Sequence, residues 1–103
     1  MVQEYKVKVY EDMTKWFNME DQIHRLDGPA VEWSNGTKEW YVNGQIHRLD
    51  GPAVEWSDGD KQWFVNGQEL TEKEFNRKVN PVKELTVEEI SKRLGYEVKI
   101  VKS

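Results

Sequence analysis

Cysteine is absent from this chain of 103 residues, which excludes disulfides, thiolate nucleophiles and cysteine-based zinc sites. Histidine occurs only at His24 and His47, and the chain has neither a Walker-type loop nor a Gly-x-Ser-x-Gly motif. No apolar run reaches membrane-spanning length, and the first residues do not have the pattern of a secretory signal peptide. We therefore expect a non-enzymatic protein with no cofactor, no metal site and no membrane span.

Apolar residues are also few, and they must build whatever core the chain has. Hydrophobic residues make up 37% of the sequence and charged residues 33%, while aromatic residues reach 12%. Aromatic side chains bury more area than aliphatic ones, so we expect Trp40 and Trp63 to be buried and to occupy equivalent positions. The size of the chain is that of one domain.

The net charge of −4 is unevenly distributed. Residues 1–70 hold 13 acidic and 7 basic residues, a balance of −6, whereas residues 71–103 hold 6 acidic and 8 basic residues, a balance of +2. An acidic body repels phosphates, so nucleic-acid binding is disfavoured. A basic protein surface is one partner that it would attract, and a solvated acidic surface is the alternative reading.

A tandem repeat with a period of 23 residues dominates the sequence. Residues 24–46 and 47–69 are identical at 18 of 23 positions, and each begins with His-Arg-Leu-Asp-Gly-Pro-Ala-Val-Glu-Trp-Ser. Residues 1–23 look like a degenerate first unit. A fixed period in this range predicts stacked copies of one supersecondary unit. The organisation expected is a β-repeat region over 1–70 and a C-terminal region over 71–103.

The repeat predicts antiparallel β-hairpins. Asn/Asp-Gly pairs are the strongest short hairpin signal, and they occur at Asn35-Gly36, Asn43-Gly44, Asp58-Gly59 and Asn66-Gly67. If each pair forms a two-residue turn, Glu32 lies opposite Glu39 and Val31 lies opposite Trp40. Alternation along the strands then places Val31, Trp33, Trp40 and Val42 on one face.

The same residue counting predicts the carboxylate partners of the arginines, and the composition of residues 49–52 predicts how the chain connects the strands. Around Asn43-Gly44 it places Arg48 opposite Glu39, so Arg48 is the expected partner for the facing carboxylates, and Arg25 repeats this one unit earlier. We expect residues 45–57 to form one long strand that bends at 49–52, because Gly and Pro there favour a bulge.

The C-terminal region carries helix signals. Thr71-Glu72-Lys73-Glu74 is a capping box that predicts a helix from near Thr71 to about Lys78. Thr86-Val87-Glu88-Glu89 is a second capping box, and residues 96–101 alternate like a strand. The fold class expected is therefore mainly β, α+β overall, with an antiparallel hairpin-repeat sheet and a helix-helix-strand cap at its far edge.

The segment from Trp40 to His47, followed by Asp50-Gly51, resembles a MORN-type repeat. The His-Arg-x-Asp-Gly-Pro-Ala variant, with its Leu-Thr-x-x-Glu-Phe exit, is similar to small proteins encoded by tailed bacteriophages. The resemblance implies a protein-interaction or membrane-associated scaffold, and some related bacterial proteins are described as antitoxins. The chain departs from the usual MORN glycine pattern by placing Arg25 and Arg48 after the histidines.

Six residues are candidates for a binding surface. They combine exposed aromatic and charged types that often dominate interfaces: Trp33, Trp56, Arg25, Arg48, Glu32 and Glu55. Core packing is the alternative for the tryptophans, and a solvated charge ladder is the alternative for the charged residues. For His24 and His47 we expect rings stacked on tryptophan with hydrogen-bonded nitrogens, because equivalent residues about 10 Å apart cannot share a metal ion. For Asp27 and Asp50 we expect hydrogen bonds from arginine or from turn backbone.

The function expected is binding of a bacterial host or defence-system protein by a phage accessory protein in the cytoplasm of the infected cell, which would make it an inhibitor of anti-phage immunity. The viral origin follows from the resemblance alone. A homo-oligomer is left open. The alternative is a small-ligand or nucleotide-sequestering protein that uses tryptophan stacking and the Arg25/Arg48 pair.

Overall fold

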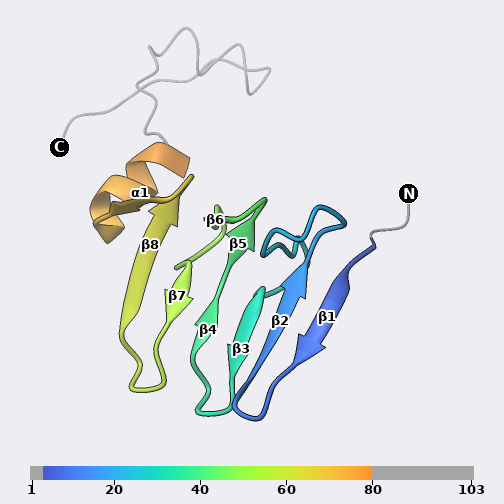
Figure 1. Cartoon of the computed structure of the whole chain (residues 1–103). Helices are drawn as coiled ribbons and strands as arrows, with labels where there is room; N and C mark the ends of the chain where they lie inside the picture. The colour runs from blue at the N-terminus through green and yellow to red at the C-terminus, as the bar shows by residue number, and fades with distance from the viewer. Residues whose placement is uncertain (1–3, 80–103) are drawn as a thin grey trace, which may run out of the picture.

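The computed structural model describes residues 4–79, which form a mainly antiparallel β structure followed by one helix (Figure 1). Seven strands make one sheet in the order β1-β2-β3-β4-β7-β8-β9, and β5 pairs with β6. The mainly β class expected from the sequence is therefore correct. The elements are β1 (Lys6–Val9), β2 (Met13–Phe17), β3 (Val31–Trp33), β4 (Lys38–Glu39), β5 (Tyr41–Val42), β6 (Gln45–Ile46), β7 (Val54–Glu55), β8 (Lys61–Val65), β9 (Gln68–Leu70) and α1 (Glu72–Val79).

The loop at Asn35-Gly36 contains three residues, so the predicted two-residue turn is wrong. The Trp33 and Thr37 backbones pair across it, and Gly36 N–H donates to the Trp33 carbonyl oxygen at 3.0 Å. Gly36 has φ +98°, whereas Asn35 does not have positive φ. This is a type I turn followed by a left-handed glycine, the usual three-residue hairpin loop. The loop at Asp58-Gly59 repeats it, with Gly59 at φ +96°.

One extra residue in the loop shifts the pairing of β3 with β4 by one residue and moves the side chains of β4 to the opposite face of the sheet. Val31 lies opposite Glu39, and Glu32 lies opposite Lys38. The predicted Glu32–Glu39 and Val31–Trp40 pairs are therefore wrong, because a slip of one residue moves every later side chain to the other face. Strand alternation now places Glu39 on the face of Trp33, here called the Trp33 face, and Trp40 on the opposite face.

The turn at Asn43-Gly44 has the two-residue form that the sequence predicts. Asn43 and Gly44 have φ of 49° and 82°, and Val42 pairs with Gln45. Positive φ at both central residues defines the type I′ turn that matches strand twist. Asn66 and Gly67 repeat these values at 50° and 81°.

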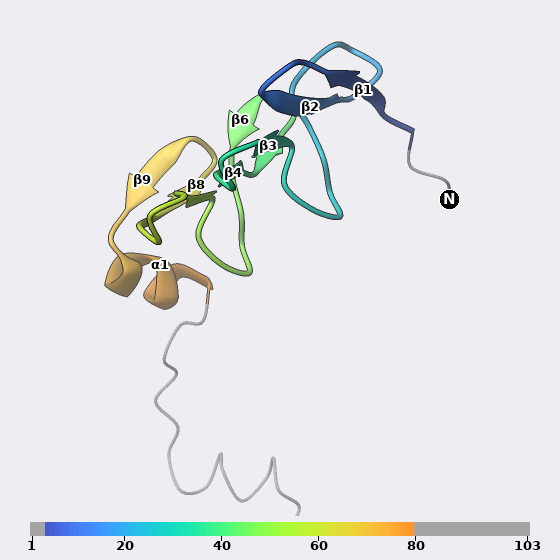
Figure 2. The ribbon, with the colours of Figure 1, turned by 90° about the horizontal axis from the view of Figure 1, so that it is seen from below.

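Residues 45–57 run antiparallel to residues 38–42 as two short strands, β6 and β7, not as one bent strand. β6 pairs with β5 and β7 pairs with β4. Trp40 bridges the break, since its N–H donates to Ala53 and its carbonyl oxygen accepts from His47. Residues 48–52 leave the sheet as a loop. This loop and the loop of residues 25–30 project on the side of the sheet that carries α1 (Figure 2).

The core of the described residues is small and mostly aliphatic. The buried hydrophobic residues are Ala30, Val31, Ala53, Val54, Val65 and Phe75. Trp40 and Trp63 are half-buried, contrary to the prediction that they would be buried. The register shift explains the difference for Trp40, because it places this ring on the face opposite Trp33, below an arginine.

α1 begins where the first capping box predicts. Glu74 N–H donates to Thr71 Oγ1, and Thr71 N–H donates to the Glu74 carboxylate, which is the reciprocal pattern of a capping box. Phe75 is buried, and α1 contacts β8 and β9. The predicted second helix near 86 and the strand over 96–101 lie outside the described residues.

We predict that Phe75→Ala lowers the free energy of unfolding by about 3 kcal/mol or more, as large aromatic deletions from cores do. Arg77→Ala, on an exposed position of the same helix, is the matched control and should change it by less than about 0.5 kcal/mol. Denaturant unfolding followed by circular dichroism measures both. Equal effects of the two substitutions would show that α1 is not anchored by Phe75.

Candidate functional site

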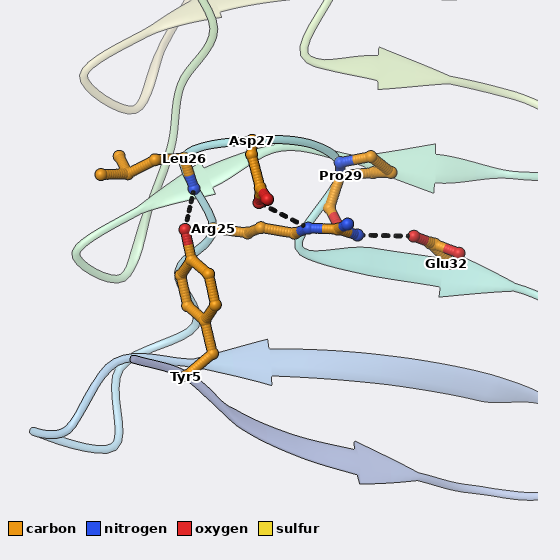
Figure 3. Close-up of polar contacts among 6 residues, drawn as sticks. All are labelled: Tyr5, Arg25, Leu26, Asp27, Pro29 and Glu32. Atoms are coloured by element: carbon orange, nitrogen blue, oxygen red, sulfur yellow. Dashed lines mark hydrogen bonds and ion pairs between the residues drawn. The ribbon is translucent and has the colours of Figure 1, made fainter. Parts of the chain in front are cut away.

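Arg25 is the centre of a compact polar cluster in the first loop (Figure 3). Its guanidinium carbon lies 3.7 Å from the centroid of the Trp16 ring. Nε donates to Asp27 at 3.0 Å, and Nη1 donates to Glu32 at 2.9 Å and to the Pro29 carbonyl oxygen at 3.2 Å. Stacking and charge-assisted hydrogen bonds together fix the orientation of the planar guanidinium.

The same cluster recurs one unit later around Arg48. Its guanidinium carbon lies 3.9 Å from the centroid of the Trp40 ring. Nε donates to Asp50 at 2.8 Å, and Nη1 donates to Glu55 at 2.9 Å and to the Pro52 carbonyl oxygen at 3.0 Å. The sequence predicted Glu39 as the carboxylate opposite Arg48, which is wrong, because Glu39 lies on the Trp33 face.

Gly28 and Gly51 leave room for these arginines. A Cβ atom at Gly28 would lie 3.0 Å from the guanidinium carbon of Arg25, and one at Gly51 would lie 2.9 Å from that of Arg48. The guanidinium is therefore held between a tryptophan ring and a bare glycine backbone. This accounts for the Arg-x-Asp-Gly-Pro motif by packing and charge.

Within these clusters the four charged candidate residues for binding are paired with each other, Arg25 with Glu32 and Arg48 with Glu55. The Arg25 and Arg48 side chains are 17% and 20% exposed, and each contacts two carboxylates. The hydrogen bond from Arg25 is the main cause that lowers the pKa of Asp27, and Arg48 does the same for Asp50. The predicted role of these aspartates as acceptors from arginine is confirmed.

The histidines bind backbone rather than stack on tryptophan. His24 Nδ1 accepts the Asn43 N–H at 2.9 Å, and His47 Nδ1 accepts the Asn66 N–H at 2.9 Å. In a neutral ring the proton is then on Nε2. The predicted hydrogen bonding is confirmed, but the group over the Trp40 ring is Arg48. Each histidine holds the Asn-Gly turn of its own unit.

The Trp33 face carries a second polar cluster, centred on Glu39. Trp33 Nε1 donates to Glu39 Oε2 at 2.6 Å, and the Tyr41 hydroxyl donates to Glu39 Oε1 at 3.0 Å. Burial, followed by the Glu39 charge, raises the pKa of Tyr41 to about 12. The carboxylate therefore fixes the edge of the Trp33 ring.

The next unit fixes its tryptophan with a neutral version of this cluster. Trp56 Nε1 donates to Gln62 Oε1 at 2.7 Å, and Gln62 Nε2 donates to Glu69 at 3.0 Å. Phe64 stands where the first unit has a tyrosine. Replacing the carboxylate by an amide removes the need for the tyrosine donor and creates a need for the Glu69 acceptor, so three of the differences between the units form one coupled set.

A surface hollow of about 300 Å³ lies between the two tryptophans. Its lining is Trp33, Asn35, Thr37, Glu39, Trp56 and Ser57. Trp56 is 47% exposed, and Ser57 N–H donates to the buried Thr37 at 3.1 Å, which joins the two hairpins. The structure thus brings together Trp33 and Trp56 and places the other four predicted residues in the arginine clusters of the opposite face. The sequence analysis missed Thr37, whose replacement by Asp60 in the second unit was the available signal.

No protein-family model, no curated protein and no solved structure matches this chain. The resemblance to MORN-type repeats therefore stays a prediction. Within residues 4–79 no helix is long and apolar enough to cross a membrane. The described part of the chain also has no group of three or more acidic or histidine side chains arranged to hold a metal ion.

We predict that Gly51→Ala lowers the free energy of unfolding by about 1–3 kcal/mol, because the new methyl group overlaps the Arg48 guanidinium. In an Arg48→Ala background the same substitution should cost clearly less, since the overlapping group is gone. A double-mutant cycle by denaturant unfolding measures this coupling. Additive effects would show that the glycine is required for a reason other than the arginine.

We predict that the phenol of Tyr41 titrates about two pH units above an unfolded tyrosine. The folded state favours the protonated phenol, so this stabilising contribution is complete below about pH 10 and is lost as the pH rises towards 12. Phenolate absorbance measures the titration, and Tyr41→Phe should remove the last step. That variant should also reduce the cost of Glu39→Gln, because the pair then matches Gln62 and Phe64. A last phenolate step that persists in Tyr41→Phe contradicts the assignment.

Proposed function

We propose that this chain is a non-enzymatic protein-interaction module whose recognition surface is the hollow between Trp33 and Trp56. The observation that carries the proposal is the pair of equivalent tryptophans, one of them 47% exposed, held by hydrogen bonds at their ring nitrogens. Rigid, partly exposed tryptophans beside an open hollow are the side chains that most often dominate interfaces. Fixing the rings before binding also reduces the entropy lost on association.

The neighbourhood of this hollow supports a basic partner. Asp58 and Asp60 are exposed on the hairpin loop that follows Trp56, and Asp12 is exposed on the loop of the first hairpin, where its carbonyl oxygen accepts the Ser34 N–H. An acidic rim around exposed tryptophan favours lysine or arginine on the partner through charge and cation–π contacts. The acidic balance of residues 1–70 agrees with this choice.

The resemblance of the repeats to those of small bacteriophage proteins directs the choice of partner to a bacterial host or defence-system protein. A hairpin-repeat sheet of MORN type, closed at its far edge by the C-terminal region, would present the tryptophans at regular spacing. The nucleotide-sequestering alternative has less support, because Arg25 and Arg48 already donate to carboxylates in their own units.

We predict that Trp33→Ala and Trp56→Ala each weaken partner binding by roughly 2 kcal/mol, about thirty-fold, and that the double variant abolishes it. Tagged wild type and variants are used to capture proteins from bacterial lysate, and the captured protein is then titrated directly. Val9→Ala, on an exposed position of the edge strand, is the control, and circular dichroism checks that each variant is folded. Unchanged binding by the folded double variant would place the recognition surface elsewhere.

A further inference from the structure

The first loop holds a tyrosine of the chain itself. Leu26 N–H donates to the Tyr5 hydroxyl oxygen at 3.1 Å. The Tyr5 ring meets the Trp16 ring edge-on at 5.4 Å between centroids and lies 6.1 Å from the His24 ring. Figure 3 shows the side chain of Tyr5 reaching up to the backbone of this loop. These groups form a cradle for a phenol.

The phenol hydroxyl is recognised there by a backbone donor. The hydroxyl oxygen accepts from Leu26, and the Tyr5 hydroxyl, after the larger effect of Arg25, contributes to lowering the pKa of Asp27. A backbone donor therefore holds this hydroxyl beside the Asp27 carboxylate. Such a donor distinguishes a tyrosine from a phenylalanine, which would leave the N–H unpaired.

The second loop repeats the cradle without the tyrosine. His47, Leu49 and Asp50 stand one period after His24, Leu26 and Asp27, and the two leucines are equally exposed at 56%. A hollow of about 240 Å³ lies there between the loops, lined by Arg25, Leu26, Val42, His47, Arg48, Leu49 and Asp50. The position one period after Tyr5 is Gly28, so this part of the chain supplies no phenol to the second cradle. Among residues 4–79, Leu49 N–H has no hydrogen bond equivalent to that of Leu26.

We infer that the hollow between the two loops is a binding site for the side chain of a tyrosine from a partner protein, with the phenol hydroxyl accepting a hydrogen bond from Leu49 N–H beside the Asp50 carboxylate. The hollow is smaller than the roughly 300–1,000 Å³ of sites for whole small molecules, so one side chain suits it better than a nucleotide. Asp50 disfavours phosphotyrosine by like charge. This site lies on the face opposite Trp33 and does not depend on the function proposed for the tryptophans.

The first experiment uses p-cresol, the side-chain analogue of tyrosine, and toluene, the analogue of phenylalanine. Each is titrated into the isotopically labelled full chain while backbone amide resonances are followed by NMR. We expect p-cresol to shift the Leu49 amide with roughly millimolar affinity, as suits so small a ligand. Toluene should bind at least about tenfold more weakly, because it leaves the N–H unpaired. No saturable shift at Leu49, or equal binding of the two compounds, overturns the assignment.

The first cradle supplies the internal control. In wild type the Leu26 amide should not respond to p-cresol, because Tyr5 occupies its cradle. In Tyr5→Ala the Leu26 amide should respond as Leu49 does, and p-cresol should restore part of the stability that the variant loses. If p-cresol rescues Tyr5→Ala at Leu26 but leaves Leu49 unaffected, the two cradles are not equivalent and the proposal fails.

The source of the tyrosine is tested separately. Nuclear Overhauser contacts from the Tyr96 ring to Leu49 in the free protein, lost in Tyr96→Ala, would show that the chain fills its own site and would overturn a partner tyrosine. Contacts that grow with protein concentration would identify a second copy and overturn it equally. Binding of N-acetyl-tyrosine amide at Leu49, with the O-phosphorylated compound at least about tenfold weaker, is the result expected for a partner's tyrosine.

Discussion

The stacking of each arginine between a tryptophan ring and a glycine backbone is the interaction on which the rest of the fold depends. Arg48 links the strand that carries Trp40, its own loop through Asp50 and the following strand through Glu55. A partly exposed ion pair contributes little alone, but a planar guanidinium with a ring below it and fixed acceptors around it defines one geometry. It holds residues 48–52 as an ordered loop next to a core of only small aliphatic residues and one phenylalanine.

Each arginine finds its hydrogen-bond acceptors within its own unit but stacks on a tryptophan of the preceding unit, and backbone hydrogen bonds add to this contact between units. Gly44 N–H donates to Ile23 and Gly67 N–H donates to Ile46 of the preceding unit, whereas His24 and His47 hold the same turns from within their own units. Each unit therefore positions the turn of the next one, as nearest-neighbour coupling in repeat proteins requires. Thr37 belongs to this coupling as well, since it accepts a hydrogen bond from Ser57 of the following hairpin.

The sequence predicts which turns, strands and helix form better than it predicts on which face of the sheet each side chain lies. The Asn43-Gly44 turn, the start of α1 and the bonding of Asp27 to arginine follow from local chemistry, which acts within a few residues. The Asn35-Gly36 loop does not, because the same dipeptide fits a two-residue turn or a three-residue loop with a left-handed glycine. That single residue reversed the partition of Trp33 and Trp40. The wrong partner for Arg48 has a separate cause, because residues 48–52 leave the sheet and Val54 lies opposite Glu39. The hollow beside Trp33 depends on side-chain positions two strands apart, which no local pattern contains.

The distribution of paired and unpaired polar groups is the basis on which we place the proposed recognition sites. Arg25 and Arg48 are paired with carboxylates of their own units and stacked on a tryptophan of the preceding unit, so the most conspicuous charges of the sequence have little left to offer a ligand. The open features lie between units: the hollow between Trp33 and Trp56 on one face, and the hollow between the loops on the other. We therefore place both proposed recognition sites at the junction of the two near-identical units, where the difference between Tyr5 and Gly28 leaves the second cradle without a tyrosine.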